Sequence, residues 1–248
     1  MDKELREQIV HCEELAANAH VALNILQYDG WILHFSEGHT GRANSVSVLY
    51  PSHLDPDEKI DYCEKQYAAQ NLPCVFKLTD GEEDLMDRLV KRGYTDITPS
   101  SVMRAEARNI KMPEGDIVLS DLPTEEWLEP YFAFEGFDER HQGIYRRMLD
   151  KLCLKAVYAA VKEQGEVVAV ASAVEDNGQM LIQNVIVDAA HRGEGYGRAV
   201  CTALLAKAAE DGIHTCFLQV LQRNTVARSL YESLGFQHVY NYCYMKKE

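Results

Sequence analysis

The feature that most constrains the fold is a strand that runs into a glycine-rich turn and then into a helix. The apolar run that ends in Val185-Ile186-Val187 is followed by Arg192-Gly193-Glu194-Gly195-Tyr196-Gly197-Arg198. Alternating glycines let a backbone bend with no Cβ in the way, so that several N–H groups converge on one point. The helix that follows directs the positive end of its dipole at the same point. The pattern predicts a pyrophosphate-binding turn.

Two common phosphate-binding motifs do not match this turn. A dinucleotide fingerprint reads G-x-G-x-x-G, and here the third glycine comes one residue too early. A Walker loop needs Gly-Lys-Ser/Thr, which does not follow. A glycine-rich strand-to-helix turn that binds no ligand is the remaining alternative.

The residues downstream continue an alternating α/β pattern. Residues 198–211 predict a helix that ends at Gly212, where a glycine in the left-handed conformation commonly follows a helix. Residues 214–220 predict a short buried strand. A second helix is predicted from Gln222 to Gly235, with an apolar face made by Val226, Leu230 and Leu234.

Two motifs in this order resemble the GNAT superfamily of N-acetyltransferases. Arg192-Gly193-Glu194-Gly195-Tyr196-Gly197 is similar to its acetyl-CoA loop, Gln/Arg-x-x-Gly-x-Gly/Ala. The second motif is Asn-x-x-Ala-x-x-Leu-Tyr-x-x-x-Gly-Phe, and it is matched by Asn224, Ala227, Leu230, Tyr231, Gly235 and Phe236. The resemblance covers about the C-terminal half, from Asp116 to the end.

The resemblance implies acetyl-CoA as the co-substrate and no metal ion. It implies that the backbone of Val185, Ile186 and Val187 pairs with the pantetheine arm as an added strand would. The loop Arg192–Arg198 would hold the pyrophosphate through its amides, and Asn224 would contact the CoA arm. Tyr231 would be the general acid that protonates the leaving thiolate, since a phenol with a pKa near ~10 keeps its proton at neutral pH.

The general base is not evident. Some relatives carry a glutamate five residues before the helix asparagine, where this chain has Gln219. Four other titratable residues cluster at the predicted acceptor side, and each is better explained as a solvated surface charge than as the base: Glu135, Asp138, Glu139 and His141. Two functions stay open, an active acyl-CoA-dependent N-acetyltransferase and a non-catalytic acyl-CoA-binding sensor. The alternative for Tyr231 is an aromatic side chain that only packs in the core.

The chain divides into two predicted domains. Residues 111–248 form the catalytic domain, and its strand and helix order is the GNAT order. Residues 1–110 are similar to a degenerate copy, because a shift of 142 residues places Cys74 on Cys216 and Gly93 on Gly235. Matching elements are predicted as helix 57–70, strand 74–78, helix 82–92 and strand 94–104. The copy lacks the glycine loop, so we expect no CoA there.

The predicted fold class is therefore α/β (α+β), with a mixed, mostly antiparallel sheet flanked by helices, in two tandem GNAT-like domains. A formal net charge of −14 disfavours nucleic acid and anionic membranes as partners. It is compatible with the expected acceptor, a primary amine of a small molecule or a peptide. Seven scattered cysteines without a Cys-x-x-Cys pair indicate neither a disulfide framework nor a zinc site. The absence of a signal peptide or a long apolar run predicts a cytoplasmic protein.

Overall fold

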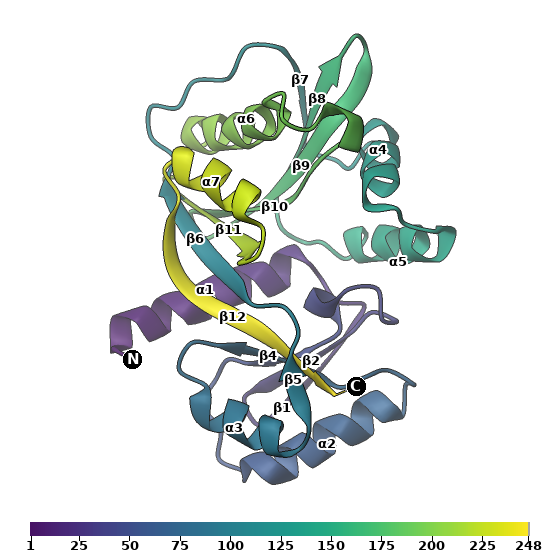
Figure 1. Ribbon diagram of the computed structural model, residues 1–248, viewed down its shortest axis with the longest axis vertical. Helices are drawn as coiled ribbons and strands as arrows, with labels where there is room; N and C mark the ends of the chain where they lie inside the picture. Colours follow the sequence, from purple (N-terminus) through teal and green to yellow (C-terminus); the bar gives the residue numbers. More distant parts are fainter. Residues whose placement is uncertain (248) are drawn as a thin grey trace. The chain divides into compact units, whose positions relative to one another are not determined.

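The computed structural model describes residues 1–247, and the chain forms two compact units (Figure 1). Unit 1 comprises Met1–Ser101, Ile144–Leu152 and the end of the chain from Tyr240. Unit 2 comprises Val102–Gly143 and Cys153–Val239. The division falls within three elements: β6 (Ser100–Glu106), α5 (Glu139–Leu149) and β12 (Gln237–Lys247).

Unit 2 is built on a sheet in the order β7-β8-β9-β10-β11-β6. Its strands are β7 (Asp116–Ser120), β8 (Ala156–Glu163), β9 (Glu166–Asp176), β10 (Gln179–Val187) and β11 (Thr215–Leu221). Its helices are α4 (Glu125–Glu135), α6 (Tyr196–Glu210) and α7 (Thr225–Ser233), with a 3-10 turn at Ala189–His191. Neighbouring strands β7 to β10 are antiparallel, whereas β10 and β11 are parallel, so the connection between them crosses over through α6.

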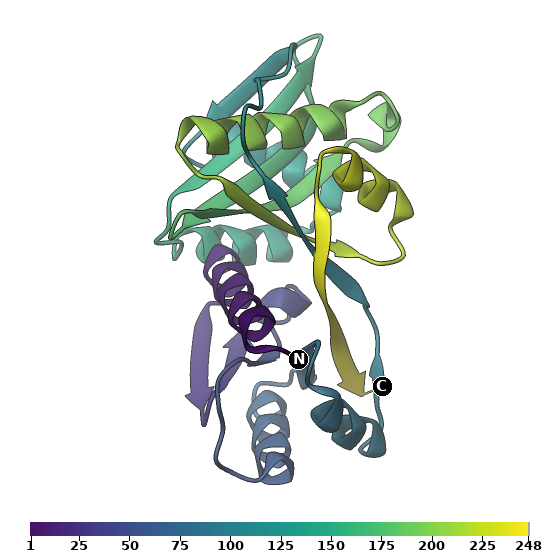
Figure 2. The same cartoon turned by 90° about the vertical axis from the view of Figure 1, so that its left-hand side faces the viewer.

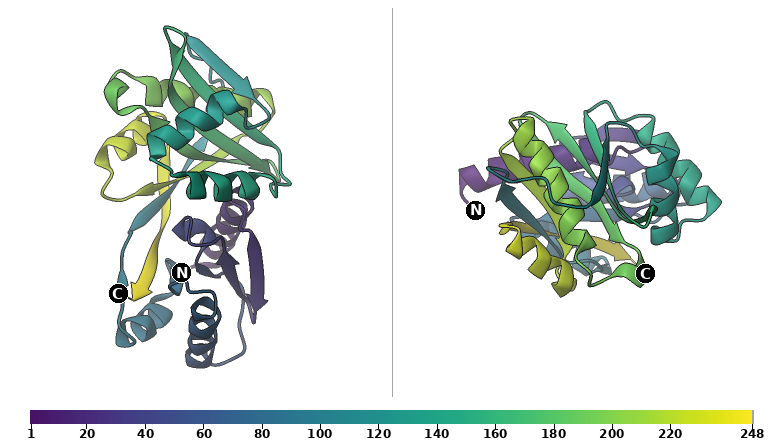
Figure 3. Two further views of the ribbon diagram at one scale, coloured as in Figure 1. Left: turned by 90° about the vertical axis from the view of Figure 1, so that its right-hand side faces the viewer. Right: turned by 90° about the horizontal axis from the view of Figure 1, so that it is seen from above.

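Two helices cover opposite faces of this sheet. Figure 2 shows α6 in front of the strands, and the left panel of Figure 3, seen from the other side, shows α4 in front of them. The apolar face predicted for the α6 helix is buried, and it packs against the alternate apolar residues of β8 to β11. The residues of that face are Val200, Cys201, Leu204, Leu205 and Ala208.

Unit 1 repeats part of this plan. After α1 (Lys3–Ala19) its sheet follows the order β1-β2-β3-β4-β12, with β5 (Tyr94–Asp96) paired to β12. Its other elements are β1 (Asn24–Tyr28), β2 (Trp31–Phe35), a 3-10 turn (Gly41–Ala43), β3 (Val46–Val48), α2 (Pro56–Ala68), β4 (Val75–Thr79) and α3 (Glu83–Lys91). The only parallel pair among these described pairings is β3 with β4, joined through α2.

The mixed α/β fold class predicted from the sequence is confirmed, but two local predictions are wrong. The strand predicted over 94–104 is two strands, β5 and β6, separated by residues 97–99, which include Pro99. Proline has no N–H to donate and restrains the residue before it, so it interrupts a ladder. Val226 is not on the buried face of α7, because its side chain is 82% exposed at the first turn.

One face of β4 is apolar, whereas the other face carries a charged side chain. Phe76 and Leu78 pack into an apolar core with α2 and α3. Lys77, which alternates with them, points to the other face, where its Nζ lies 2.5 Å from Oε2 of Glu13 on α1. Tyr240 donates to the other oxygen of Glu13 at 2.8 Å. All three side chains are buried, so the ion pair is shielded from water.

Glu13→Ala should therefore destabilise the protein by roughly 3–5 kcal/mol, because it leaves the Lys77 ammonium buried without its counter-charge. Urea unfolding would measure the loss. Glu7→Ala is the control, since Glu7 on the same helix pairs with Lys3 at the surface and should cost under about 1 kcal/mol. Equal losses for the two variants would contradict this view of the buried pair.

Candidate functional site

The candidate site begins where β10 separates from β11. Their parallel pairing runs from Gln179 opposite Thr215 to Ile182 opposite Leu218. Within the described pairing, the following residues of β10 are matched only to β9, with Ile186 opposite Val170 and Val187 opposite Ala169. Val185, Ile186 and Val187 thus form a strand edge that faces away from β9 with no strand of the described chain beside it. Such an edge presents N–H and C=O groups to an extended ligand.

A β-bulge produces this separation. The register with β9 shifts between Gln183 and Ile186, and Asn184 adopts φ +56° within the shift. Asparagine tolerates this left-handed conformation better than most residues. Its side chain is fixed from two sides: Nδ2 donates to Oγ of Ser172 at 2.9 Å, and Oδ1 accepts from the Tyr131 hydroxyl at 3.3 Å. The bulge is thereby tied to β9 and to α4.

Tyr131 and Asn184 were not predicted as site residues. Tyr131 is buried and stacks on Trp127 with ring centroids 4.8 Å apart, and the Trp127 indole donates to the carbonyls of Ala159 and Ala171. A sequence signal did exist at Asn184, because the pair Gln183-Asn184 interrupts an otherwise apolar strand. The partner on α4 is 53 residues away in sequence and leaves no local signal.

The glycine loop has the open geometry that its sequence predicts. Gly193 and Gly195 have φ of +86° and +94°, and a Cβ built on either would meet nothing within 4 Å. Gly195 is the N-cap of α6 and therefore supplies no side chain to bond the first amides of the helix. Open space beside uncapped helix amides suits an anion.

Neighbouring residues hold this loop in place. Asp188 bonds Nδ1 of His191 at 2.7 Å, and this contact, the largest cause, lowers the pKa of the Asp188 carboxyl. Glu163, at the tip of the β8–β9 hairpin, lies 3.7 Å from Nε2 of His191. A hydrogen bond to Glu163 also raises the pKa of the Tyr196 phenol to about 12. Arg192 and Glu194 are exposed on the loop.

The start of α7 converges on the same region. A Cβ on Gly197 would lie 3.4 Å from both Leu230 of α7 and Val187 of β10, so these three elements meet closely. Arg198 also reaches α7 and donates to Ser233 Oγ at 2.5 Å. Asn224 is the N-cap of α7, with Oδ1 accepting from Ala227 N at 3.1 Å. The structure thus brings the β10 edge, the loop and α7 together.

Tyr231 lies on α7 and is only 7% exposed, edge-on to Phe236. Burial, with a smaller effect of the nearby Cys201, raises the pKa of its phenol. The hydroxyl therefore stays protonated throughout the neutral range. Gln219 lies on β11 one residue past the paired stretch.

Two of the four candidate bases form a pair. His141 Nδ1 lies 2.6 Å from Asp138 Oδ1, and the His141 amide donates to the same oxygen at 2.8 Å. These bonds lower the pKa of the Asp138 carboxyl, the amide bond most. Phe137 stacks on the His141 ring and contacts Tyr131 edge-on.

Two further kinds of site are absent from residues 1–247. No three His, Cys, Asp or Glu side chains in that range come together as a metal ion would require. None of the helices described there has the combined length and apolar character that crossing a bilayer takes.

One family model and several known proteins match this chain. The family model described as "Probable histone acetyltransferase Rv0428c C-terminal" matches residues 7–245. The uncharacterized N-acetyltransferase YobR of Bacillus subtilis is 27% identical over 250 residues, covering 97% of this chain and 99% of that protein. The ribosomal protein bS18-alanine N-acetyltransferase of Haemophilus ducreyi is 35% identical over 77 residues, 31% of this chain and 53% of that protein.

Solved structures are similar over the whole chain. A GCN5-related N-acetyltransferase from Kribbella flavida has a TM-score of 0.68 at 17% identity, covering 100% of this chain and 96% of that one. A tandem GNAT protein from the clavulanic acid biosynthesis pathway has a TM-score of 0.67 at 11% identity, covering 100% and 95%. These likenesses establish the fold, including its tandem arrangement.

Gly195→Val should abolish acetyl-CoA binding, because its side chain would fill the space beside the first α6 amides. Isothermal titration calorimetry would measure the affinity. Gly212→Val is the matched control: Gly212 follows the other end of α6, has φ +75°, and also has open space around it. It should impose similar backbone strain without lowering affinity. Unchanged affinity in folded Gly195→Val protein would refute the assignment.

Asn184→Ala should weaken acetyl-CoA binding and turnover by about tenfold, because alanine disfavours φ +56° and loses both side-chain bonds. Asn184→Gly separates the two effects, since glycine accepts the backbone conformation and removes only the bonds. Steady-state kinetics would rank the wild type above Asn184→Gly and Asn184→Gly above Asn184→Ala. Wild-type kinetics in both variants would show that the bulge does not need this anchor.

Proposed function

Because the chain belongs to the family described as probable histone acetyltransferase Rv0428c C-terminal, within the GNAT superfamily of N-acetyltransferases, we propose that it transfers an acetyl group from acetyl-CoA to a primary amine. The activity lies in residues 111–248, and the acceptor is a small molecule or a peptide. The observation that carries the proposal is the separation of β10 from β11 directly before the open glycine loop.

The residues present fit acetyl-CoA at three points. The amides of Gly193 to Arg198 would bond the pyrophosphate, at the positive end of a helix of 15 residues. The edge of Val185–Val187 would pair with the amides of the pantetheine arm. Asn224 already uses Oδ1 as a helix cap, so its Nδ2 would donate to that arm.

The reaction requires a neutral amine to attack the thioester carbonyl carbon. A C–N bond forms, the tetrahedral intermediate collapses, the C–S bond breaks, and the sulfur leaves with the electron pair. Tyr231 would donate its phenolic proton to this thiolate and recover one from solvent or from the ammonium product. Burial raises the pKa of the phenol, so the hydroxyl carries its proton at neutral pH when the thiolate forms.

Correct positioning of the two substrates would supply much of the remaining rate enhancement. Holding the thioester beside the amine makes the encounter effectively unimolecular. The Asp138–His141 pair supports a role as proton acceptor for the amine, because the carboxylate fixes the orientation of the imidazole.

Two observations bear on the acceptor. The chain's net charge of −14 favours the approach of a cationic amine. The Haemophilus ducreyi relative is named for the alanine of a ribosomal protein, which supports a peptide amine among the candidates. A panel of polyamines, aminoglycosides, and peptides with free N-termini would cover both classes.

Tyr231→Phe should lower turnover by about 10²–10⁴-fold and leave the affinity for acetyl-CoA nearly unchanged, because the lost bond develops mainly in the transition state. Thiol release from acetyl-CoA with the best amine of the panel would measure it. Tyr158→Phe is the matched control, since Tyr158 is another buried tyrosine of unit 2 and lies on β8. It should retain activity.

The same assay separates catalysis from sensing. Acetyl-CoA binding without thiol release to any amine would favour the non-catalytic acyl-CoA sensor, with Gln219 in place of a base. Near-normal turnover in Tyr231→Phe would instead leave the phenol as a wall of the pocket and require another proton donor.

A further inference from the structure

Unit 1 contains a counterpart of the proposed acyl-CoA site of unit 2, and the register of its strands identifies that counterpart. Val46 of β3 pairs with Phe76 of β4, as Ile182 of β10 pairs with Leu218 of β11. Phe76 and Leu218 match under the shift of 142 residues. Counted from this pair, Leu49 corresponds to Val185, although the ladder of unit 1 continues for one more pair, Ser47 with Lys77. The shift also matches Glu82, the N-cap of α3, with Asn224, the N-cap of α7.

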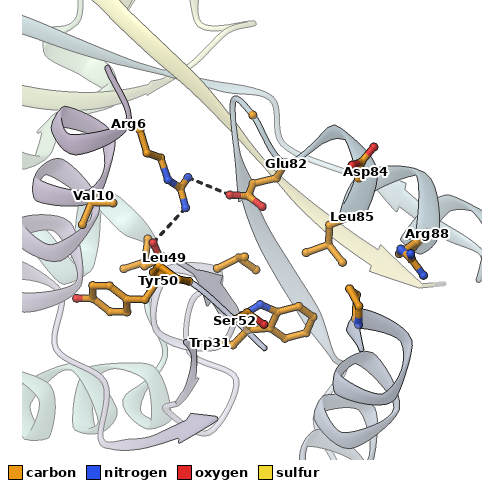
Figure 4. A pocket seen from close by; sticks show the side chains of 14 residues that line it. Arg6, Val10, Trp31, Leu49, Tyr50, Ser52, Glu82, Asp84, Leu85 and Arg88 are labelled. Atoms are coloured by element: carbon orange, nitrogen blue, oxygen red, sulfur yellow. Dashed lines mark hydrogen bonds and ion pairs between the residues drawn. The ribbon is translucent and has the colours of Figure 1, made fainter. Parts of the chain in front are cut away.

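Arg6 occupies the strand-edge part of this counterpart. Its guanidinium donates to the carbonyl of Leu49 at 3.1 Å and to Oε1 of Glu82 at 2.9 Å. Figure 4 shows the side chain of Arg6, from α1, held by these two bonds at a cavity of about 540 Å³. Arg6 thus bonds the carbonyl of Leu49, which corresponds to Val185, and the side chain of Glu82, which corresponds to Asn224.

Asp29 occupies the loop part. It is the first turn residue of the β1–β2 hairpin, where Tyr28 pairs with Trp31, and its φ is +41°. Its carboxylate accepts from the amides of His53 and Leu54, each at 2.9 Å, and from the Ser52 hydroxyl at 2.8 Å. These residues directly precede α2, as the glycine loop precedes α6. The donors, led by the Leu54 amide, hold the pKa of Asp29 well below its usual range.

A buried cation completes this arrangement. Lys59 in the second turn of α2 is 0% exposed, and its Nζ lies 3.3 Å from Oδ2 of Asp29. The same ammonium lies 4.0 Å from the ring centroid of Trp31. Two amides, a hydroxyl and an ammonium around one anion form the kind of donor set that binds a phosphate group.

We infer that unit 1 is a self-occupied acyl-CoA site, in which the Asp29 carboxylate takes the place of the pyrophosphate and the Arg6 guanidinium closes the strand edge. The chain then binds one acyl-CoA, in unit 2. The corresponding hairpin of unit 2 lacks this feature: its first turn residue is Gln164, with φ +52°, and it is exposed. Only the comparison with unit 2 rests on the proposed function.

Asp29→Gly tests the inference by emptying the anion position while keeping the turn, because glycine readily adopts positive φ. We expect the melting temperature to fall by on the order of 5 °C, since Lys59 loses its counter-charge. Millimolar sulfate should reverse at least half of that fall, because sulfate would enter the vacated position. Sodium chloride at equal ionic strength should not.

Gln164→Gly is the matched control at the same position of the corresponding hairpin. Sulfate stabilises folded proteins in general, so the inference requires a larger gain in Asp29→Gly than in Gln164→Gly or the wild type. Asp29→Asn should melt lower than the wild type but show no extra gain, because its amide still fills the position. Equal sulfate responses in all four proteins would overturn the inference. If Asp29→Gly does not fold in chloride, recovery of folded protein on refolding in sulfate provides the same comparison.

Calorimetry of the wild-type chain with acetyl-CoA supplies a second, independent readout. One molecule bound per chain is expected, and two would overturn the inference. If acetyl-CoA does not bind at all, the proposed function fails, whereas the melting comparison still decides whether Asp29 holds an anion position.

Discussion

Parallel strands in one sheet leave room for a ligand only where their backbone hydrogen bonding stops, and stopping it exposes groups that must bond something else. In unit 2 this happens after the pair Ile182–Leu218. Asn184 fixes the conformation of β10 at this interruption. Its left-handed conformation redirects the strand, and its side-chain amide bonds Ser172 and Tyr131. The edge of Val185–Val187 follows directly after that bulge, and Gly197 of α6 lies close to both Val187 and Leu230 of α7.

The parts of this site that depend on local chemistry were readable in the sequence. Glycine spacing predicted the turn because φ values such as +86° and +94° are costly for other residues. Periodicity predicted a helix over 198–211, and α6 begins two residues earlier, at Tyr196. Asn224 was expected inside a helix that starts at Gln222, whereas it is the N-cap of α7. Contacts between distant segments were not readable. The bond from Tyr131 to Asn184 and the bond from Arg6 to Glu82 each join elements that no local pattern links.

Two mistaken local predictions have different origins. Val226 fits an apolar helical stripe, but the end of a helix that projects from the sheet leaves its first turn exposed. The strand 94–104 has the right composition, yet a single proline divides it. Periodicity identifies which residues can share a face, whereas tertiary packing decides whether that face is covered.

The two units illustrate how one topology satisfies the same backbone groups in different ways. A loop that enters a helix after a parallel strand presents amides that favour an anion. In unit 1 the Asp29 carboxylate bonds those amides, and a fixed internal charge carries no cost of association. In unit 2 glycines leave the amides open. An internal carboxylate therefore stabilises the fold permanently, whereas an open loop gains its bonds only when a phosphate arrives. That difference supports the proposals of a structural role for unit 1 and of acyl-CoA binding in unit 2.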